Sequence, residues 1–295
     1  MTRVGVIGIG DMGSGLARNL IKAGFQVAGH DLLANRMADF KAMGGIACAN
    51  AAEVGTGARA VFIMVMSGAE ARDVILGDGL ASVMVPGTAV IVTATIHAPE
   101  MQEIARALGD TGINLIDSPV SGGYPGAHGG TLALMTAAPA DVLEANRDVL
   151  NAVSKVIHHV GTEPGMGQTV KACLQTLIGG IFAATYEMSV LAGKAGVSGD
   201  VLRQVIASTG AGNGITDGSL ENIIARRFEG TGSGINTMHK DLTIALELAK
   251  AMGVPMHSTA TAMQLFQAGM TKYPDGDNQC VAKVIEEIVG AQLGA

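Results

Sequence analysis

Short apolar runs alternate with helical patterns through the first half of the chain. The runs that predict buried strands occupy residues 4–7, 25–30, 60–66, 89–92, 113–116 and 155–160. Continuous apolar strands are typical of a parallel sheet that is covered on both faces. Helical spacing appears between several of them, for example across 34–43 and 141–150. This alternation predicts an α/β domain of the Rossmann type with a mostly parallel sheet.

The second half of the chain has a helical pattern throughout. Helices are predicted at 167–195, 199–208, 220–227, 237–252, 257–270 and 278–289. Residues 161–165 include two glycines and a proline, so we expect a hinge there. We therefore predict a dinucleotide-binding domain at 1–163 and an all-helical domain at 164–295, joined by a long helix. Polar residues interrupt the apolar part of that helix, which favours a buried helix over a membrane span.

A glycine turn follows the first predicted strand and reads Gly8-Ile9-Gly10-Asp11-Met12-Gly13. Glycines at this spacing, between a strand and a helix, allow a tight turn and a close approach of the backbone to a pyrophosphate. Asp31 ends the second predicted strand, where a carboxylate meets the adenosine ribose. The order of strand, turn, helix, strand and acid predicts a dinucleotide site. The alternative is a doubly wound domain whose tight first turn binds no ligand.

Further candidates stand where later predicted strands end, because ligands of open α/β sheets bind beyond the carboxyl ends of the strands. Met66 and Ser67 follow one strand and Thr95 follows the next, and all three are predicted to contact the cofactor. The alternatives are an ordinary turn and a helix-capping threonine. A glycine-rich stretch then includes Ser121-Gly122-Gly123, whose backbone N–H groups are predicted to bind an anion. A flexible hairpin loop is the alternative there.

Lys171 is the candidate for catalysis. It falls in the first turns of the long helix, just after the hinge, and is expected to face a cleft between the domains. An alcohol that is oxidised by a nicotinamide must also lose a proton, and a lysine can accept it when burial and a nearby cation lower its pKa. Gln175 lies on the same helical face and is predicted to orient substrate hydroxyls. Lys240 is predicted to reach the cofactor. The alternatives are a solvated lysine at a helix start and an exposed Lys240–Asp241 pair.

Composition narrows the possible partners. The chain has a net charge of −7 without a long basic run, no tryptophan and three tyrosines. Nucleic acid is therefore not expected as a partner, because it requires basic patches and aromatic stacking platforms. The three cysteines match no zinc or redox spacing, so we expect no metal site and a reduced, cytoplasmic setting.

Four motifs in order resemble those of the β-hydroxyacid dehydrogenase family. They are the glycine turn at 8–13, Asp117-Ser118-Pro119-Val120-Ser121-Gly122-Gly123, Gly165-Met166-Gly167-Gln168-Thr169-Val170-Lys171, and Lys240-Asp241-Leu242. The resemblance covers nearly the whole chain. It implies an N-terminal Rossmann domain, a helical C-terminal domain, and a homodimer or homotetramer built through the helical domain.

The resemblance also implies a role for each motif. Ser121, Gly122 and Gly123 would hold a substrate carboxylate, Lys171 would be the general acid/base, and Thr95 and Lys240 would touch the cofactor. The implied reaction is NAD(P)-dependent oxidation of the 3-hydroxyl of a small β-hydroxy acid. The alternatives are reduction of a short semialdehyde acid by the same residues and a dinucleotide-binding sensor without activity.

Two features bear on the substrate and the cofactor. The family commonly has two asparagines three and four residues after the lysine, where this chain has Leu174 and Gln175. Gln175 and the later Gly276-Asp277-Asn278 resemble the L-threonate dehydrogenase branch, so a four-carbon, threonate-like acid is expected. Asp31 would repel a 2′-phosphate, which favours NAD, while the nearby Arg36 keeps NADP as the alternative.

Overall fold

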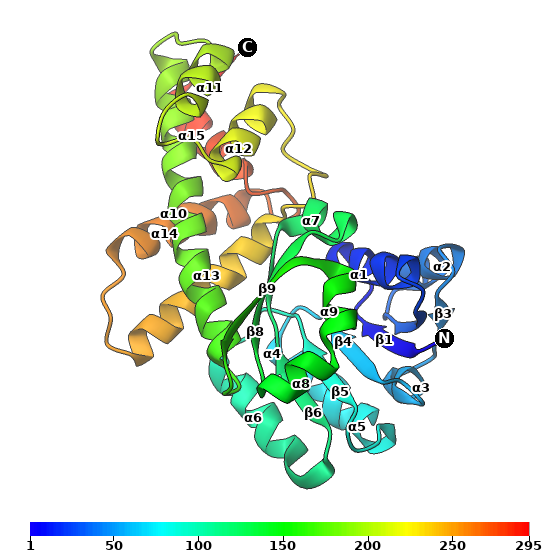
Figure 1. Ribbon diagram of the computed structural model, residues 1–295. Coiled ribbons are helices and arrows are strands. Elements are labelled where there is room, and N and C mark those ends of the chain that lie inside the picture. Colours follow the sequence, from blue (N-terminus) through cyan, green and yellow to red (C-terminus); the bar gives the residue numbers. More distant parts are fainter. Residues whose placement is uncertain (295) are drawn as a thin grey trace. The chain divides into compact units, whose positions relative to one another are not determined.

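The computed structural model describes residues 1–294, which form two compact units (Figure 1). Unit 1 spans Met1–Lys171 and unit 2 begins at Ala172. The long helix α10 (Met166–Lys194) therefore starts in unit 1 and continues in unit 2. The domain boundary at 163/164 stays a prediction, since the compact units divide after Lys171, within α10.

Unit 1 is built on one sheet of nine strands. The strands are β1 (Arg3–Ile7), β2 (Gln26–His30), β3 (Ile46–Ala47), β4 (Ala60–Ile63), β5 (Ala89–Val92), β6 (Asn114–Asp117), β7 (Val120–Ser121), β8 (Leu132–Ala137) and β9 (Ser154–Gly161). Their order is β3-β2-β1-β4-β5-β6-β8-β7, with β9 paired to β8. The strands from β3 to β6 are parallel, and β8 runs antiparallel to β6 and β7. The order 3-2-1-4-5-6 is that of a dinucleotide-binding sheet, whose ligand crevice opens between β1 and β4.

Helices cover both faces of this sheet, and each face has its own core. One core joins the helices α1 (Asp11–Lys22), α2 (Ala34–Ala42), α8 (Ala140–Ala145) and α9 (Arg147–Val153) to strand residues such as Phe62 and Ile91. The other joins α3 (Ala51–Gly55), α4 (Gly68–Arg72), α5 (Leu80–Val83) and α6 (Ala98–Leu108) to the alternate residues, such as Val61 and Val90. Successive strand side chains point to opposite faces, which is why apolar residues run without interruption. The predicted Rossmann-type domain with a mostly parallel sheet is confirmed.

Several predicted elements differ from the observed ones. Residues 141–150 form parts of two helices, α8 and α9, because the chain turns at the buried Asn146, whose amide donates to the carbonyl of Val142. The strand predicted at 60–66 ends at Ile63, and the last residues lead into α4. Strand β8 and helix α7 (Gly123–Gly129) were not predicted, since glycine at five of the positions 117–131 conceals the helical segment. The alternative interpretation of the glycine-rich stretch as a flexible hairpin loop is therefore wrong.

Unit 2 is all helical. Its helices after α10 are α11 (Gly199–Ala207), α12 (Gly214–Ile224), α13 (Ile235–Ala251), α14 (His257–Lys272) and α15 (Cys280–Val289). Figure 1 shows α13 and α14 crossing the lower part of α10, and α11, α12 and α15 gathered at its far end. Tyr186, Leu242 and Phe266 are fully buried in the core of this unit. Gly179 lets α13 approach α10, because a Cβ there would lie 2.6 Å from Leu242.

Helix α10 is long and apolar enough to cross a membrane by length and composition, with a mean hydropathy of 1.3. Its most apolar window is 39% buried within the protein. A buried core helix of a protein that lies outside the membrane can have the same length and hydropathy.

Candidate functional site

The glycine turn joins β1 to α1 and depends on its glycines. Gly8 has φ +86°, and a Cβ there would lie 2.3 Å from the carbonyl oxygen of Met64. A Cβ at Gly13 would lie 1.8 Å from the carbonyl oxygen of Gly8. Gly10 is the N-cap of α1, and no side chain caps this helix. The N-terminus of α1 therefore has no side-chain cap and lies next to the glycine turn. This arrangement fits the pyrophosphate of a dinucleotide.

Asp31 stands at the end of β2, as predicted, and is held by the backbone around it. Its carboxylate accepts N–H hydrogen bonds from Ile9 at 2.8 Å and from Leu33 at 2.9 Å. Arg36 forms an ion pair with it at 3.4 Å, and the Asp31 side chain is only 6% exposed. A Cβ at Gly10 would lie 3.5 Å from the Arg36 guanidinium. A cation thus lies close to both the acid and the glycine turn, as the short spacing of Arg36 from Asp31 in the sequence suggested.

The candidates at the ends of β4 and β5 also lie at the carboxyl edge of the sheet. Met66 is half exposed, and the Ser67 hydroxyl accepts the N–H of Glu70 at 3.2 Å as the N-cap of α4. Ser67 therefore has a local structural role, and its contact with a cofactor stays a prediction. Thr95 is half buried in the loop after β5, and the N-cap of α6 is His97. The interpretation of Thr95 as the helix cap is therefore wrong.

Ser121 ends β7, and Gly122 and Gly123 follow it with exposed backbone. Both glycines have positive φ, +132° and +57°, so the peptide groups turn in a way that other residues rarely allow. Helix α7 then packs against α1, because Gly15 leaves room for the backbone of Ala127. The His128 ring nitrogen Nε2 lies 2.9 Å from the carbonyl oxygen of Asp11. The predicted anion-binding segment is thereby tied to the helix of the glycine turn.

Lys171 is buried in α10, with 7% of its surface exposed. The alternative of a solvated lysine is therefore wrong. The turn of α10 before it contacts the buried carboxylate of Asp117 at the end of β6. Burial raises the pKa of Asp117 to about 6, although hydrogen bonds from Gly165, Gln168 and Gly167 act to lower it. Asp117 was known from the sequence only as part of a motif, since its partners lie about 50 residues away.

In unit 2, Gln175 lies on α10 and Asp241 on α13, and both are buried. The Gln175 amide nitrogen donates to the Asp241 carboxylate at 2.6 Å, while its Oε1 atom is buried without a hydrogen-bond partner. Lys240 forms an ion pair with Asp241 at 3.0 Å. Because Asp241 is 2% exposed, the alternative of an exposed surface pair is wrong. The pair Gln175–Asp241 leaves one amide oxygen that can accept a hydrogen bond.

The structure thus brings most candidates to one edge of unit 1. The glycine turn, Asp31, Met66, Ser67, Thr95 and Ser121–Gly123 all follow the carboxyl ends of strands. Lys171 belongs to the same unit, while Gln175 and Lys240 belong to unit 2. Within residues 1–294, no group of three His, Cys, Asp or Glu side chains is placed to hold a metal ion.

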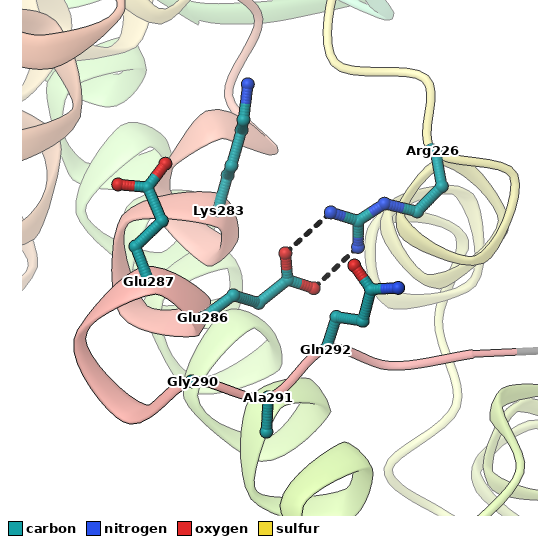
Figure 2. Close-up of a pocket in the computed structure, with 7 residues that line it drawn as sticks. All are labelled: Arg226, Lys283, Glu286, Glu287, Gly290, Ala291 and Gln292. Atoms are coloured by element: carbon teal, nitrogen blue, oxygen red, sulfur yellow. Dashed lines mark hydrogen bonds and ion pairs between the residues drawn. The ribbon is translucent and has the colours of Figure 1, made fainter.

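A cavity of about 380 Å³ lies in unit 2, and none of these candidates lines it (Figure 2). It is lined by Arg226, Lys283, Glu286, Glu287, Gly290, Ala291 and Gln292. The Arg226 guanidinium donates two hydrogen bonds to the Glu286 carboxylate, at 2.6 and 2.7 Å. Glu287 pairs with Lys272, and Lys283 lies 4.4 Å from the centre of the Tyr273 ring. Each charged side chain of the lining already has a partner, so the cavity connects the segment after α12 with α15 through structural contacts.

Comparison with known proteins identifies the family. A family model described as the NAD binding domain of 6-phosphogluconate dehydrogenase matches residues 3–161. A second, described as the NAD-binding of NADP-dependent 3-hydroxyisobutyrate dehydrogenase, matches residues 165–285. The two matches follow one another along the chain, one on the Rossmann unit and one on the helical part.

Relatives match over nearly the full length. The chain is 32% identical to an L-threonate dehydrogenase of Escherichia coli, over 97% of this chain and 95% of that protein. It is 31% identical to a 2-(hydroxymethyl)glutarate dehydrogenase of Eubacterium barkeri, over 99% and 97%. The crystal structure of a 3-hydroxyisobutyrate dehydrogenase from Salmonella typhimurium superposes with a TM-score of 0.89 at 32% identity, covering 96% of this chain and 100% of that one. The chain therefore belongs to the β-hydroxyacid dehydrogenase family and is a hydroxyacid dehydrogenase that uses NAD or NADP.

Proposed function

We propose that this dehydrogenase oxidises the 3-hydroxyl of a small, hydroxyl-rich β-hydroxy acid, with Lys171 as general base. The observation that supports this most is the burial of Lys171, at 7% exposure, in the same unit as the glycine turn. Lysine side chains are seldom buried to this extent. When bound, NAD(P)⁺ supplies the acceptor for the hydride that leaves the carbinol carbon.

Proton transfer, substrate binding and cofactor binding are assigned to separate groups of residues. Lys171 Nζ accepts the hydroxyl proton as the carbonyl forms, and returns it when the reaction runs in reverse. Ser121, Gly122 and Gly123 bind the substrate carboxylate through their backbone N–H groups, and the positive φ of Gly122 and Gly123 supports an anion-binding turn there. The cofactor is held by Gly8, Ile9, Gly10, Asp11, Met12 and Gly13, by Asp31, and by Met66, Ser67, Thr95 and Lys240.

Gln175 supports a substrate with an additional hydroxyl. Its amide nitrogen is engaged by Asp241, and its oxygen Oε1 is buried without a partner. A buried acceptor without a donor costs about 1–3 kcal/mol, so a substrate that offers an O–H there is favoured over one that offers a methyl group. We therefore expect L-threonate, the substrate in the name of the relative from Escherichia coli, to be preferred over 3-hydroxyisobutyrate.

The test combines a substrate panel with one substitution. Purified protein is mixed with NAD⁺ or NADP⁺ and with L-threonate, 3-hydroxyisobutyrate, L-serine or glycerate, and the reduced cofactor is followed by absorbance. Lys171→Met should lower kcat by about 10²–10⁴-fold, the usual contribution of general acid–base catalysis, and leave the Kd for the cofactor within a few fold. Lys155→Met, which alters an exposed lysine of β9, serves as the matched control. Turnover by the Lys171→Met variant at the wild-type rate would refute the role of Lys171.

Reduction of a short semialdehyde acid is the same reaction in reverse and uses the same residues, so the panel is also run with reduced cofactor. A sensor without activity does not agree with membership of a family of dehydrogenases.

We further propose that the protein works in the cytoplasm as a homodimer or homotetramer, and that its substrate is a small molecule rather than a nucleic acid or a membrane. The net charge of −7 and the absence of a basic run support the exclusion of nucleic acid.

A further inference from the structure

Asp117 forms a buried contact that joins the end of β6 to the start of α10. Its side chain is 1% exposed. Its Oδ2 atom accepts the backbone N–H groups of Gly165 at 2.8 Å, Gly167 at 2.9 Å and Gln168 at 3.4 Å. Its Oδ1 atom accepts a hydrogen bond from the Gln168 side chain at 2.9 Å. One carboxylate therefore receives four donors from a single turn of chain, the turn that immediately precedes Lys171.

Gln168 extends this contact to a third element. Its side-chain nitrogen also donates to the carbonyl oxygen of Ala94 at 3.1 Å, and its oxygen accepts the N–H of Ile96 at 3.0 Å. These two backbone groups flank Thr95, the predicted cofactor contact after β5. The Gln168 amide thus uses both of its ends, so its orientation is fixed, and at 1% exposure it is closed to water.

Close packing makes this contact specific. A Cβ at Gly167 would lie 2.6 Å from the carbonyl oxygen of Met135 on β8 and 2.9 Å from Asp117 Cγ. Ser118, the residue after Asp117, lies 2.8 Å from the Thr136 hydroxyl, oxygen to oxygen, and both side chains are fully buried. The start of α10 therefore lies directly against the backbone of β8 and the Asp117 side chain of β6.

We propose that Asp117 and Gln168 are positioning residues that fix Lys171 relative to Thr95 and to the carboxylate-binding segment 121–123. Lys171 follows Gln168 by three residues, so less than one helical turn separates the anchored backbone from the reacting amine. The carboxylate lies at the N-terminus of α10, where a negative charge is favoured by the helix dipole. Segment 121–123 continues from the same strand end, four residues after Asp117. This proposal rests on the role of Lys171 proposed above.

We expect the rate of the reaction to depend on how well Lys171 is aligned with the substrate. Displacing a reacting group by about 1 Å can cost on the order of 100-fold in rate, and losing a residue that orients a functional group costs about 10–100-fold. Asparagine at position 117 keeps the size of the side chain. Its NH₂ group, however, would replace one of the two oxygens and would then face N–H donors of residues 165–168. One of the four hydrogen bonds at least is lost, and the start of α10 is released from β6.

The experiment compares Asp117→Asn, Gln168→Ala and the double variant with the wild type. With L-threonate and NAD⁺, each single variant should lower kcat by about 10–100-fold while the Kd for NAD⁺ changes less than threefold. The double variant should be no slower than the slower single variant, because the two residues act as one unit. Additive losses in the double variant, or a kcat within threefold of wild type for Asp117→Asn, would overturn the proposal.

A second readout does not depend on turnover. Amide hydrogen exchange of a peptide that covers residues 164–172 should be faster in Asp117→Asn than in the wild type, because the helix start has lost its anchor. Asn146→Ala is the matched control, since it removes a buried amide of the same unit that lies outside the contact. It should leave both kcat and the exchange of 164–172 unchanged, and equal exchange in Asp117→Asn and wild type would contradict the anchor. If the wild type oxidises no acid of the panel while the exchange differs as expected, the proposed function fails and the anchor stands.

Discussion

At residue scale, the ion pair of Asp31 and Arg36 changes the expected choice of cofactor. Asp31 gives both oxygens to the backbone of Ile9 and Leu33, and its side chain is 6% exposed. The Arg36 side chain is 43% exposed and lies near Gly10. An arginine at this place accommodates the 2′-phosphate of NADP, whereas a free carboxylate binds the 2′-hydroxyl of NAD. The carboxylate that favoured NAD in the sequence is thus partly neutralised.

Arg36→Ala should separate the two cofactors. The KM for NADP⁺ should rise about tenfold or more, since a hydrogen bond to a charged group contributes about 1.5–3 kcal/mol, while the KM for NAD⁺ should stay within threefold. Initial rates at varied cofactor concentration, with L-threonate saturating, measure both. Lys41→Ala, an exposed lysine on the same helix α2, is the control. An equal loss with both cofactors would contradict a contact between Arg36 and the 2′-phosphate.

Asp117 also makes stability depend on pH. Its pKa is raised by burial from 3.8 to about 6 in the folded protein, so the folded state holds the proton more tightly. The stability that this proton contributes is fully present below pH 3.8 and is lost as the pH rises through about 6. A shift of about two pKa units corresponds to about 3 kcal/mol. Ionised Asp117 is therefore a cost to stability that accompanies its role at the helix start.

Urea unfolding of wild type and Asp117→Asn between pH 4 and pH 7.5 measures this contribution. The free energy of unfolding of the wild type should fall relative to the variant as the pH rises, by up to about 3 kcal/mol over the range. Asn146→Ala, whose substitution removes no titrating group, should follow the wild-type pH dependence in parallel. A difference between wild type and Asp117→Asn that does not change with pH would contradict the raised pKa.

At element scale, strands and helices were predictable wherever apolar periodicity was strong. The strand at 89–92 and the start of α14 at His257 agree with the expected bounds, and the glycine turn lies between β1 and α1 as expected. Strand β8 and helix α7 were missed because their glycine-rich surroundings have no clear period. The contact of Asp117 with the start of α10 was missed for another reason, since no local pattern shows which residues meet across 50 positions of the chain.

Helix α7 is held against α1 by a glycine, which gives a test of the packing. A Cβ at Gly15 would lie 2.6 Å from the carbonyl carbon of Ala127, an approach that the backbone must relieve by shifting. Gly15→Ala should therefore lower the free energy of unfolding by about 1–3 kcal/mol, although alanine is the better helix former by about 1 kcal/mol.

Gly218→Ala is the matched control, because Gly218 also lies within a helix, α12, and a Cβ there meets nothing within 4 Å. Thermal unfolding followed by circular dichroism should show a lower Tm for Gly15→Ala and an equal or higher Tm for Gly218→Ala. A Tm for Gly15→Ala at or above that of the wild type would show that α7 does not pack on α1 as described.

At the scale of the whole molecule, one helix links the two units and also carries an uncovered apolar stripe. The members of this stripe repeat every three or four residues along α10 and are exposed or half exposed: Leu177, Ile181, Ala184, Met188 and Leu191. Leu177 is 63% exposed and Leu191 is 70% exposed. A repeat of three and four residues is the pattern with which one helix packs against another. The stripe therefore accounts for the apolar character of α10 without a membrane, provided that a second copy of the chain covers it.

The double variant Leu177→Glu, Leu191→Glu should convert the expected dimer or tetramer to monomers, because two charges would be buried in an apolar contact without partners. Size-exclusion chromatography with light scattering measures the mass of each species. Val85→Glu, which alters an apolar residue of unit 1 that is 61% exposed, should leave the mass unchanged. Flotation of the wild type with lipid vesicles tests the competing explanation, and the protein should stay behind. A monomeric wild type, an unchanged mass of the double variant, or flotation with the vesicles would each contradict an interface between copies along α10.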